Sequence, residues 1–537
     1  MSGNYIWMPL LVSLVGLIFM FMPFLEIYLE SVLFSSDLIV YKMSFFLDKT
    51  SIIFLFMVGA ISSMVYFYSL EYMKFDLFKT KFMVLMMMFV TSMMMLSVSS
   101  DLFWCMLGWD GLGIVSFALI FFYSNWKSYN SAMVTFVSNR VGDICMIYSI
   151  IFLSMNSSSS WIGLSQFYTI WFFFLLGVFS KSAQVPFSAW LPLAMAAPTP
   201  VSSLVHSSTL VTAGIYMMIR FKAMLSDDVM WWMYSISSIS ILLAGVSSIG
   251  ETDFKKIIAL STLSHISLII MMISIKSFNS AMIHMVMHAF FKSLLFMIVG
   301  FIIHENLNSQ DLRSISSSDK KINLSIVISI SSMCGIPFLS GFYSKEIMSA
   351  SLKDSHTWWV FYVAVLITST YSVRMMKMFM GCGNIMTMTH VSSTKFFLLF
   401  CILCATIGLI CNNFYGQDFM ENFYSSKSNI MAMLFIFSGW GFGTFLVNNY
   451  YYLKNSKLVL MMSYVCMSFS IMVVWVYPIL DSSKKIMYDL DLKGVTEKIL
   501  FFNPILNSFQ KGEFMNSLIS FFPVVKFMSI LVGLLLF

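Results

Sequence analysis

Two lysines stand alone inside long apolar stretches of the sequence. Lys181 is the only charged residue in WFFFLLGVFSKSAQVPFSAW. Lys345 lies beside Glu346 in INLSIVISISSMCGIPFLSGFYSKEIMSA, after the helix-breaking glycines and proline of that stretch. A charge at bilayer depth costs about 2.5–3.5 kcal/mol on insertion scales, so such a residue is a functional hypothesis by default. Because each lysine lies near a helix-breaking Pro or Gly, the pair predicts two copies of one ion-handling device.

Three other charged residues have candidate partners. Asp110 is the only acid in the apolar run 102–123. A nearby ammonium would keep this carboxylate ionised, and the expected partner is Lys181. The proton affinity of Lys181 would rise as the carboxylate approaches and fall as it moves away. The alternative is a static ion pair that fixes helix register. Arg140 and Asp143, in NRVGD, are spaced i and i+3, which favours a structural pair on one helix face.

Histidines supply the next candidates. His284, His288 and Lys292 recur every four residues in AMIHMVMHAFFKSLLF. This spacing places them along one stripe of a helix, about 6 Å apart, and favours a hydrated proton wire. A metal pair is the weaker interpretation, because the HExxH glutamate and a third ligand are absent from that stretch; structural polar packing is the third. His206, in HSSTLV, can take or pass a proton at neutral pH, and its place between two buried lysines favours a relay over core packing.

The candidates form one series in chain order. Lys345, at its end, is a terminal loading site or a side chain that snorkels to the interface. The predicted relay consists of Asp110, Lys181, His206, His284, His288, Lys292 and Lys345. The supporting residues are Arg140, Asp143, Lys256, His265, Glu346 and Ser372. For Lys256 and its neighbour Lys255, a solvated helix end is the ordinary alternative.

Membrane helices have to position these side chains. The 537 residues are 59% hydrophobic and 10% charged, with a mean hydropathy of +0.85, which excludes a soluble protein. We therefore predict an all-α polytopic fold with about 15 spans of roughly 20 apolar residues. The spans are 6–26, 51–71, 82–99, 102–123, 132–154, 165–196 (broken), 199–221, 229–249, 256–274, 280–303, 322–350 (broken), 357–379, 395–412, 429–448 and 523–537. The run 456–480 is long enough to be a sixteenth.

An internal repeat organises these spans. Lys181 and Lys345 are 164 residues apart, and the same offset carries HSSTLV onto TSTYSV at 368–373. Each copy has a broken helix followed by a polar-studded span, as in transporters with inverted repeats. The predicted domains are N-terminal spans 1–75, five-helix repeats 76–228 and 229–380, peripheral spans 381–480, a lateral amphipathic segment 481–522 and a terminal anchor 523–537.

Charge asymmetry predicts the orientation. Thirteen lysines and arginines fall on the side of the membrane that follows the second span, and seven fall on the other side. Inner loops carry the excess of positive charge, so the side with thirteen is predicted to be the inner side, and the N-terminus is predicted to lie there too. The segment 481–522 then stays inside, where its mixed polar and apolar residues suit a helix lying along a surface.

The sequence shows no sign of a redox cofactor. We find no Walker loop, no GxGxxG after a strand, no CxxCH and no cysteine array for iron–sulfur. Cys401 and Cys404 form a CxxC inside an apolar run, where helix packing is the favoured interpretation. The 49 methionines and only four arginines are typical of AT-rich organellar genomes. A transit peptide is not evident at the N-terminus.

Six segments carry a family resemblance. They are LGWDGLGIVSF, SNRVGDI, KSAQVPFSAWLPLAMAAPTPVSSLVHSSTLVTAGIYMMIRF, DFKKIIALSTLSHISL, MHAFFKSLLFMIVGFIIH and GIPFLSGFYSKE. They resemble the subunit 5 family of mitochondrial NADH dehydrogenase (respiratory complex I) and the related antiporter-like subunits, densely over 100–380. The chain departs from many members in having Asp110 in place of one glutamate and Ala197 in place of another, and we expect it to have one N-terminal span fewer.

The resemblance implies proton translocation across the inner mitochondrial membrane by a mitochondrially encoded, multi-pass subunit. The drive would be NADH oxidation by ubiquinone elsewhere in the complex, with FMN, iron–sulfur clusters and ubiquinone in other subunits and no cofactor in this chain. The implied partners are neighbouring antiporter-like subunits, accessory subunits and inner-membrane lipids including cardiolipin, with no nucleic acid. The alternatives are a cation/proton antiporter subunit and a passive membrane-arm scaffold.

Overall fold

The computed structural model describes residues 27–35, 40–155, 168–222, 225–306, 309–312, 320–352, 355–381 and 426–448. The predicted spans 6–26, 395–412, 456–480 and 523–537, the lateral segment 481–522 and the side of the N-terminus lie outside these residues. The described residues all belong to one of two compact units of the chain, the unit Met1–Ser463.

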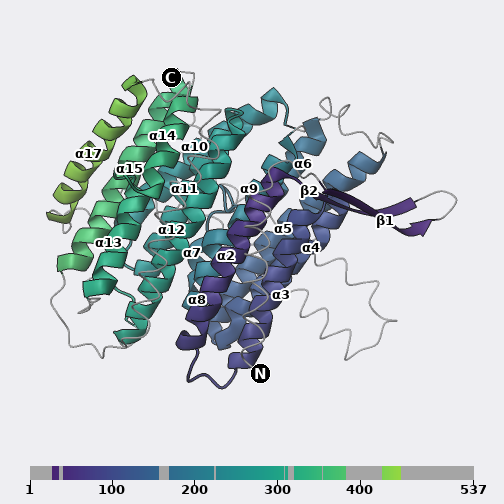
Figure 1. The fold of residues 1–537 in the computed structure, drawn as a ribbon, viewed down its shortest axis with the longest axis horizontal. Helices are drawn as coiled ribbons and strands as arrows, with labels where there is room; N and C mark the ends of the chain where they lie inside the picture. Colours follow the sequence, from purple (N-terminus) through teal and green to yellow (C-terminus); the bar gives the residue numbers. More distant parts are fainter. Residues whose placement is uncertain are drawn as a thin grey trace, which may run out of the picture. The chain divides into compact units, whose positions relative to one another are not determined.

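Helices make up nearly all of the described structure (Figure 1). The first part contains α2 (Lys49–Tyr72), α3 (Lys79–Val98), α4 (Leu102–Ile120), η1 (Phe121–Tyr123), α5 (Trp126–Met155), α6 (Tyr168–Lys181), α7 (Trp190–Leu193), η3 (Ala194–Ala196), α8 (Thr199–Val201), η4 (Ser202–Thr209) and α9 (Leu210–Arg220). The second part contains α10 (Asp227–Gly250), α11 (Phe254–Ser274), α12 (Phe278–Glu305), α13 (Lys320–Cys334), α14 (Ser340–Ser351), α15 (Ser355–Gly381) and α17 (Ser426–Asn448).

Nine helices of the described part are long and apolar enough to cross a membrane. Helices suit this setting because they satisfy their own backbone hydrogen bonds, which lipid cannot do. In α11 and α12, 94% of the most apolar window is buried, whereas in α17 only 22% is. The centre of the packing is therefore at α11 and α12, while α17 contacts α15 at the periphery (Figure 1).

Both predicted helix breaks are present. The first separates α6 from α7, at residues 182–189, and the second separates α13 from α14, at residues 335–339. At the second break, Gly335 has φ +90°, a conformation that favours glycine, and a Cβ at Gly341 would lie 1.8 Å from the carbonyl oxygen of Ser332. The turn and the close approach after it therefore both require glycine.

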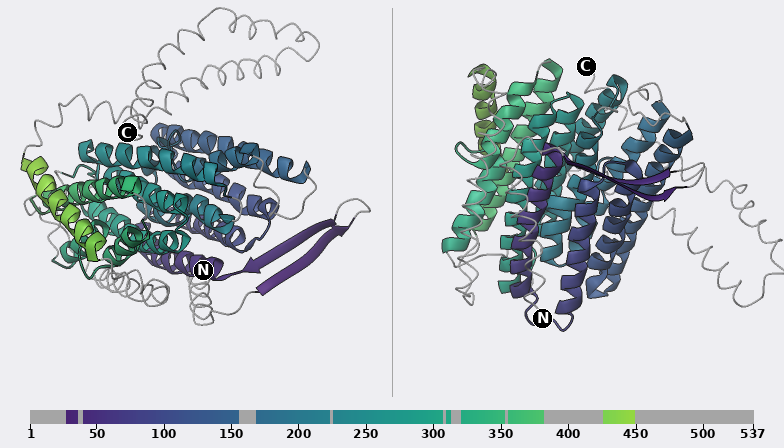
Figure 2. Two further views of the ribbon diagram at one scale, coloured as in Figure 1. Left: turned by 90° about the horizontal axis from the view of Figure 1, so that it is seen from above. Right: turned by 45° about the vertical axis from the view of Figure 1, so that its right-hand side comes forward.

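The all-α prediction missed a β-hairpin. β1 (Ile27–Ser35) pairs with β2 (Val40–Leu47) in an antiparallel ribbon, and Figure 2 shows both strands beside the helices. Both segments are rich in aromatic and β-branched residues, which favour strands. Arg220 fixes the base of the ribbon, because its guanidinium contacts the Asp48 carboxylate at 2.5 Å and the carbonyl oxygen of Phe46 at 2.7 Å.

Helix starts recur with a constant spacing. α4 starts at residue 102 and α11 at 254, and α5 starts at 126 and α12 at 278, so each pair is 152 residues apart. The offset of 164 that joins Lys181 to Lys345 is thus not the spacing of the helices. By helix position Lys181 corresponds to Met333, because Lys181 ends the half-helix before its break and Lys345 lies in the half-helix after its own.

Candidate functional site

Lys181 is buried at the end of α6. Its Nζ donates a hydrogen bond to the carbonyl oxygen of Trp109 in α4 at 3.1 Å and lies 5.0 Å from the centre of the Trp109 ring. Gly113, one turn further along α4, leaves room for the ammonium, because a Cβ there would lie 3.4 Å from Nζ. The lysine therefore reaches sideways from the helix break to the middle of an intact helix.

Asp110 pairs with Arg140 rather than with Lys181. Arg140 Nη1 lies 3.5 Å from Asp110 Oδ1 and 3.2 Å from Asp143 Oδ2. Asp110 and Lys181 form no ion pair within the described residues, because the Lys181 ammonium contacts the Trp109 carbonyl instead, so their expected partnership stays a prediction. The side chains of Asp110 and Arg140 are 41% and 36% exposed as a whole, although the Asp110 Oδ1 that faces Arg140 is buried.

The predicted pair of Arg140 and Asp143 is confirmed as a contact. Asp143 is buried and also accepts a hydrogen bond at 2.8 Å from Nε1 of Trp109, the residue whose carbonyl holds Lys181. Trp109 thus joins the carboxylate to the lysine. We call Trp109, Asp110, Arg140, Asp143 and Lys181 the first cluster.

His206 lies in η4, a π-helical stretch between α8 and α9. Its side chain is fully buried, its ring centre is 6.0 Å from that of Trp190, and neither ring nitrogen has a hydrogen-bond partner within the described residues. π-Helical turns occur often at functional sites. The position suits a group that exchanges its hydrogen bonds rather than one held by fixed ones.

The histidines of α12 join with one from α11. His265 Nδ1 lies 3.2 Å from His284 Nε2, and the ring centres of His265 and His288 are 5.6 Å apart. His284 Nδ1 continues to Ser344 Oγ at 2.9 Å, next to Lys345. The stripe expected on one helix is therefore a zigzag across three helices, with the supporting residue His265 at its centre.

Lys292 is fully buried one turn beyond His288. Its Nζ donates to Ser261 Oγ at 2.5 Å and contacts Met333 Sδ at 3.0 Å. Both acceptors are neutral, so in the described part of the chain this ammonium has no carboxylate within ion-pair distance. The Lys292 ammonium lies between α11 and the end of α13, just before the second helix break.

Lys345 folds back onto the end of α13. Its Nζ donates to the carbonyl oxygens of Met333 and Cys334 at 3.0 and 2.9 Å and to Thr368 Oγ1 at 3.1 Å. The side chain is 3% exposed, so the snorkelling alternative is wrong. The three acceptors do not include the neighbouring Glu346, which is half-buried; successive residues of a helix point in different directions.

We call His265, His284, His288, Lys292, Ser344 and Lys345 the second cluster. Its hydroxyl and thioether acceptors, Ser261, Met333, Ser344 and Thr368, were missed from the sequence. Thr368 lies one helix turn before the predicted Ser372, so the same helix face could have indicated it. The Ser372 hydroxyl itself donates to the Ser369 carbonyl oxygen at 2.9 Å.

The two lysines at the start of α11 differ. Lys256 is 38% exposed and pairs with Asp253 at 2.8 Å, as a solvated helix end would. Lys255 is 6% exposed, and its Nζ lies 3.5 Å from the carbonyl oxygen of Ala197, so a solvated end is the wrong interpretation for this residue.

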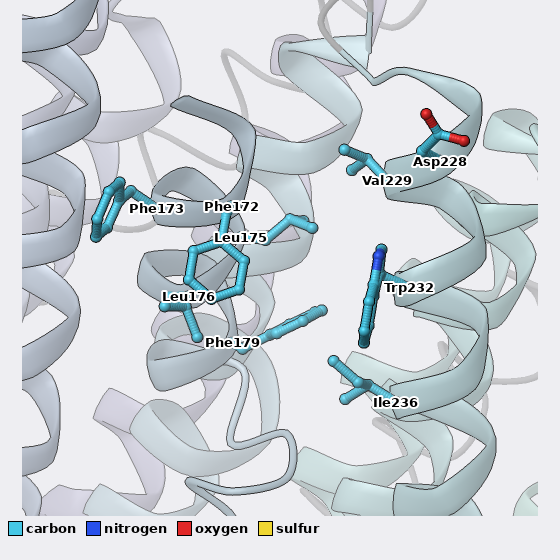
Figure 3. Close-up of a pocket in the computed structure, with 9 residues that line it drawn as sticks. All are labelled: Phe172, Phe173, Leu175, Leu176, Phe179, Asp228, Val229, Trp232 and Ile236. Atoms are coloured by element: carbon cyan, nitrogen blue, oxygen red, sulfur yellow. The ribbon is translucent and has the colours of Figure 1, made fainter. Parts of the chain in front are cut away.

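A pocket of about 490 Å³ is lined by none of the residues of either cluster (Figure 3). Phenylalanines and leucines of α6 line one side and residues of α10, including Trp232, line the other. Asp228 is its single charged side chain. Within the described residues, no group of three His, Cys, Asp or Glu side chains has metal-binding geometry either. The lining of this pocket is thus almost wholly apolar, whereas the two clusters are polar and mostly buried.

Sequence comparisons place all these residues in one family region. The profile of the family described as NADH:quinone oxidoreductase/Mrp antiporter, TM, matches residues 99–372, and that of NADH-Ubiquinone oxidoreductase (complex I), chain 5 N-terminus, matches 34–83. The first match includes both clusters and His206.

Curated relatives cover more of the chain. NADH-ubiquinone oxidoreductase chain 5 of Aedes aegypti is 36% identical over 474 residues, which are 84% of this chain and 80% of the relative. Chain 5 of Anopheles quadrimaculatus is 43% identical over 351 residues, which are 62% of this chain and 60% of the relative, and that of Anopheles gambiae is 40% identical over 384 residues, 68% and 66%. The matches to the two Anopheles chains thus span less than two thirds of those chains' length.

Solved structures show the same fold. The Mrp complex from Dietzia sp. DQ12-45-1b matches with a TM-score of 0.63 at 22% identity, over 96% of this chain and 57% of that one. The membrane-bound sulfane sulfur reductase, an archaeal respiratory membrane complex, matches with a TM-score of 0.69 at 15% identity, over 81% and 93%. Profile, relatives and fold agree, and the chain belongs to the NADH-ubiquinone oxidoreductase chain 5 family.

Proposed function

We propose that this multi-span membrane protein translocates protons as a membrane-arm subunit of the proton-translocating NADH:ubiquinone reductase, respiratory complex I. The observation that carries the proposal is a set of fully buried lysines and histidines, spread over both broken helices and the helices between them, within the region shared with the family. Ionisable side chains at such depth are costly and typically mark proton relays. The relay consists of Asp110, Lys181, His206, His284, His288, Lys292 and Lys345.

The first cluster acts as the loading end. Arg140 holds both carboxylates, while Lys181 is bound only by a carbonyl oxygen and an aromatic face. A carboxylate that approaches an ammonium stabilises its charged form, and one that withdraws releases it. Exchange of Asp143 or Asp110 between Arg140 and Lys181 would therefore load and unload the lysine.

The second cluster acts as the relay and outlet. A proton released by Lys292 passes along His288, His265 and His284, and then through the Ser344 hydroxyl toward Lys345. The spacing between His265 and His284 and between His284 and Ser344 is that of direct hydrogen bonds. A neutral imidazole can accept a proton on one nitrogen and release one from the other. Water carries the steps between clusters and His206.

Partner subunits supply the energy. Moving a proton against about 180 mV costs roughly 4 kcal/mol at 2.3 kcal/mol per 100 mV. In this proposal NADH oxidation by ubiquinone in other subunits provides it, and the partners are neighbouring antiporter-like and accessory subunits and cardiolipin of the inner mitochondrial membrane. The constant helix spacing supports the two repeats that we propose, 76–228 and 229–380.

The proposal is tested by Lys181→Ala in the assembled complex, with Lys276→Ala as control. Lys276 forms an exposed ion pair with Asp227 outside the buried clusters. We expect fewer protons moved per NADH oxidised in Lys181→Ala and an unchanged ratio in Lys276→Ala. Normal pumping with normal assembly in Lys181→Ala would favour a passive scaffold. A membrane potential that needs an ion gradient instead of NADH and quinone would favour a cation/proton antiporter.

A further inference from the structure

We infer that Tyr72, Tyr68 and Thr199 form a proton-entry branch that leads from exposed His304 to the buried His206. The inference rests on the proposed function and adds a route to it. The branch lies where α2, α8 and α12 contact one another, at the side of the membrane on which α2 ends (Figure 1). Neither lysine of the helix breaks belongs to it.

The outer half of the branch consists of aromatic rings. His304 is exposed in the last turn of α12, and its ring centre lies 5.5 Å from that of Tyr72. Tyr72 lies one turn after Tyr68 on α2, with ring centres 5.6 Å apart. Residues at i and i+4 share a helix face, so the two phenols follow one another inward from the exposed histidine.

The inner half begins with a hydrogen bond between two helices. Tyr68 Oη and Thr199 Oγ1 are 3.0 Å apart, and both side chains are buried at 4% and 1% exposure. Gly300 makes the contact possible, because a Cβ there would lie 2.5 Å from each of the two oxygens. Gly300 and His304 are one turn apart on α12, opposite Tyr68 and Tyr72.

Thr199 starts a line of polar residues that ends at His206. Ser202, Ser203 and His206 follow Thr199 closely in the chain and lie in the π-helical stretch η4. Ser202 and Ser203 donate their hydroxyl hydrogens to the carbonyl oxygens of Thr199 and Pro200. Their hydroxyl oxygens can still accept a hydrogen bond, and both nitrogens of His206 are unpartnered among the described residues.

The transfer is balanced by exchange of hydroxyl hydrogens. A proton arriving on Tyr68 Oη forms a new O–H bond, and the original phenolic hydrogen leaves to Thr199 Oγ1. Thr199 in turn passes its own hydrogen toward His206, and rotation of each hydroxyl restores the starting arrangement. A tyrosine–threonine bond that only anchors α2 to α8 would need neither the exposed histidine at one end nor the unpartnered histidine at the other.

Tyr68→Phe in the assembled complex tests the branch, because it removes one oxygen and keeps the ring. Tyr66→Phe is the matched control, since Tyr66 is buried on the same helix and its hydroxyl donates to the Met83 carbonyl oxygen at 3.4 Å, outside the branch. The readout is protons translocated per NADH oxidised, measured with a pH indicator in sealed vesicles. We expect Tyr68→Phe to lower the ratio to the level of Lys181→Ala and Tyr66→Phe to leave it unchanged.

Thr199 provides a second test that does not depend on the phenol. Thr199→Val should lower the ratio in the same way, whereas Thr199→Ser keeps the hydroxyl and should pump normally. A normal ratio in Tyr68→Phe and Thr199→Val, together with a lowered ratio in Lys181→Ala, overturns the branch and leaves the proposed function standing. A normal ratio in all three variants overturns both.

Discussion

The two helix breaks hold their lysines in different ways. At the first, Lys181 precedes the break and donates to the Trp109 carbonyl, which lies in the middle of α4. At the second, Lys345 follows the break and donates to the Met333 and Cys334 carbonyls, which end α13. A mid-helix carbonyl already accepts a hydrogen bond within its helix, whereas the last carbonyls of a helix have no such partner.

In the proposed relay, Lys181 only carries a proton, whereas Lys345 also caps a helix end. Lys181 can leave its carbonyl without exposing an unsatisfied group. Lys345 satisfies two terminal carbonyls in a buried place and puts a positive charge at the negative end of the α13 dipole. We therefore expect the second break to link proton transfer to helix stability and the first to leave them separate.

The largest expected effect comes from Lys181→Met and Lys345→Met. Both should slow proton transfer through this subunit by about 100-fold or more, the usual effect of losing a proton-transfer group. Only Lys345→Met should also destabilise the subunit, by about 1–3 kcal/mol, because it leaves buried carbonyls unsatisfied. Protons per NADH and the amount of assembled complex after mild heating measure the two effects. Equal heat sensitivity of both variants would remove the distinction.

The glycines beside each break give the next comparison. A Cβ at Gly341 would lie 1.8 Å from the Ser332 backbone oxygen, while a Cβ at Gly142 would lie 1.8 Å from the Ser180 hydroxyl. Backbone cannot move aside as a hydroxyl can. Gly341→Ala should therefore cost more than the ~1–3 kcal/mol of ordinary overpacking, and Gly142→Ala about that amount.

Assembly levels of the two glycine variants check this order. Adding Ser180→Ala to Gly142→Ala removes the clashing hydroxyl and should restore part of the loss. No single side-chain change can do so for Gly341→Ala, since its obstacle is the main chain. Full assembly of Gly341→Ala would show that α13 and α14 can separate at the second break.

Local pattern was enough to predict most of the helices and both breaks. Runs of about 20 apolar residues identify membrane helices because lipid leaves few other structures, and Gly or Pro identifies where they end. The pair of Arg140 and Asp143 followed from i,i+3 spacing on one helix. The hairpin was missed because its short strands carry a weaker signal than a membrane span.

Contacts between helices were not predictable in the same way. Asp110 contacts Arg140 because of how α4 turns toward α5, and one sequence does not contain that rotation. The acceptors of Lys292 and Lys345 are a serine, a methionine, a threonine and two carbonyls, and such groups occur throughout the chain. The predicted repeat offset of 164 residues paired Lys181 with Lys345 because both are buried lysines, although they occupy different positions in their helices.

A smaller effect is expected from the cation of the first cluster. Arg140→Gln leaves Asp110 and Asp143 without their shared partner, and Lys181 becomes the nearest buried cation. The stability cost should be about 1 kcal/mol, because Arg140 and Asp110 are more than a third exposed. Proton transfer should slow by less than the factor of about 100 expected for Lys181→Met, because Arg140 only shifts Asp143 between two cations and is not itself a relay group.

Arg140→Lys is the matched control for that variant. It keeps the charge, and the corresponding position of α12 by the 152-residue spacing is itself a lysine, Lys292. Pumping should return to near normal in Arg140→Lys. If Arg140→Gln and Arg140→Lys pump alike, the charge at this position has no part in loading Lys181.

The smallest expected effect is that of Thr368→Val in the second cluster. It removes one of three acceptors of Lys345 and nearly preserves volume, while both α13 carbonyls still hold the ammonium. The loss of stability should be about 1 kcal/mol, that of one hydrogen bond, and pumping should change less than twofold. A loss of stability or pumping as large as that of Lys345→Met would mean that the threonine, rather than the end of α13, positions the lysine. The proposed contrast between the two breaks would then depend on a side chain instead of on helix ends.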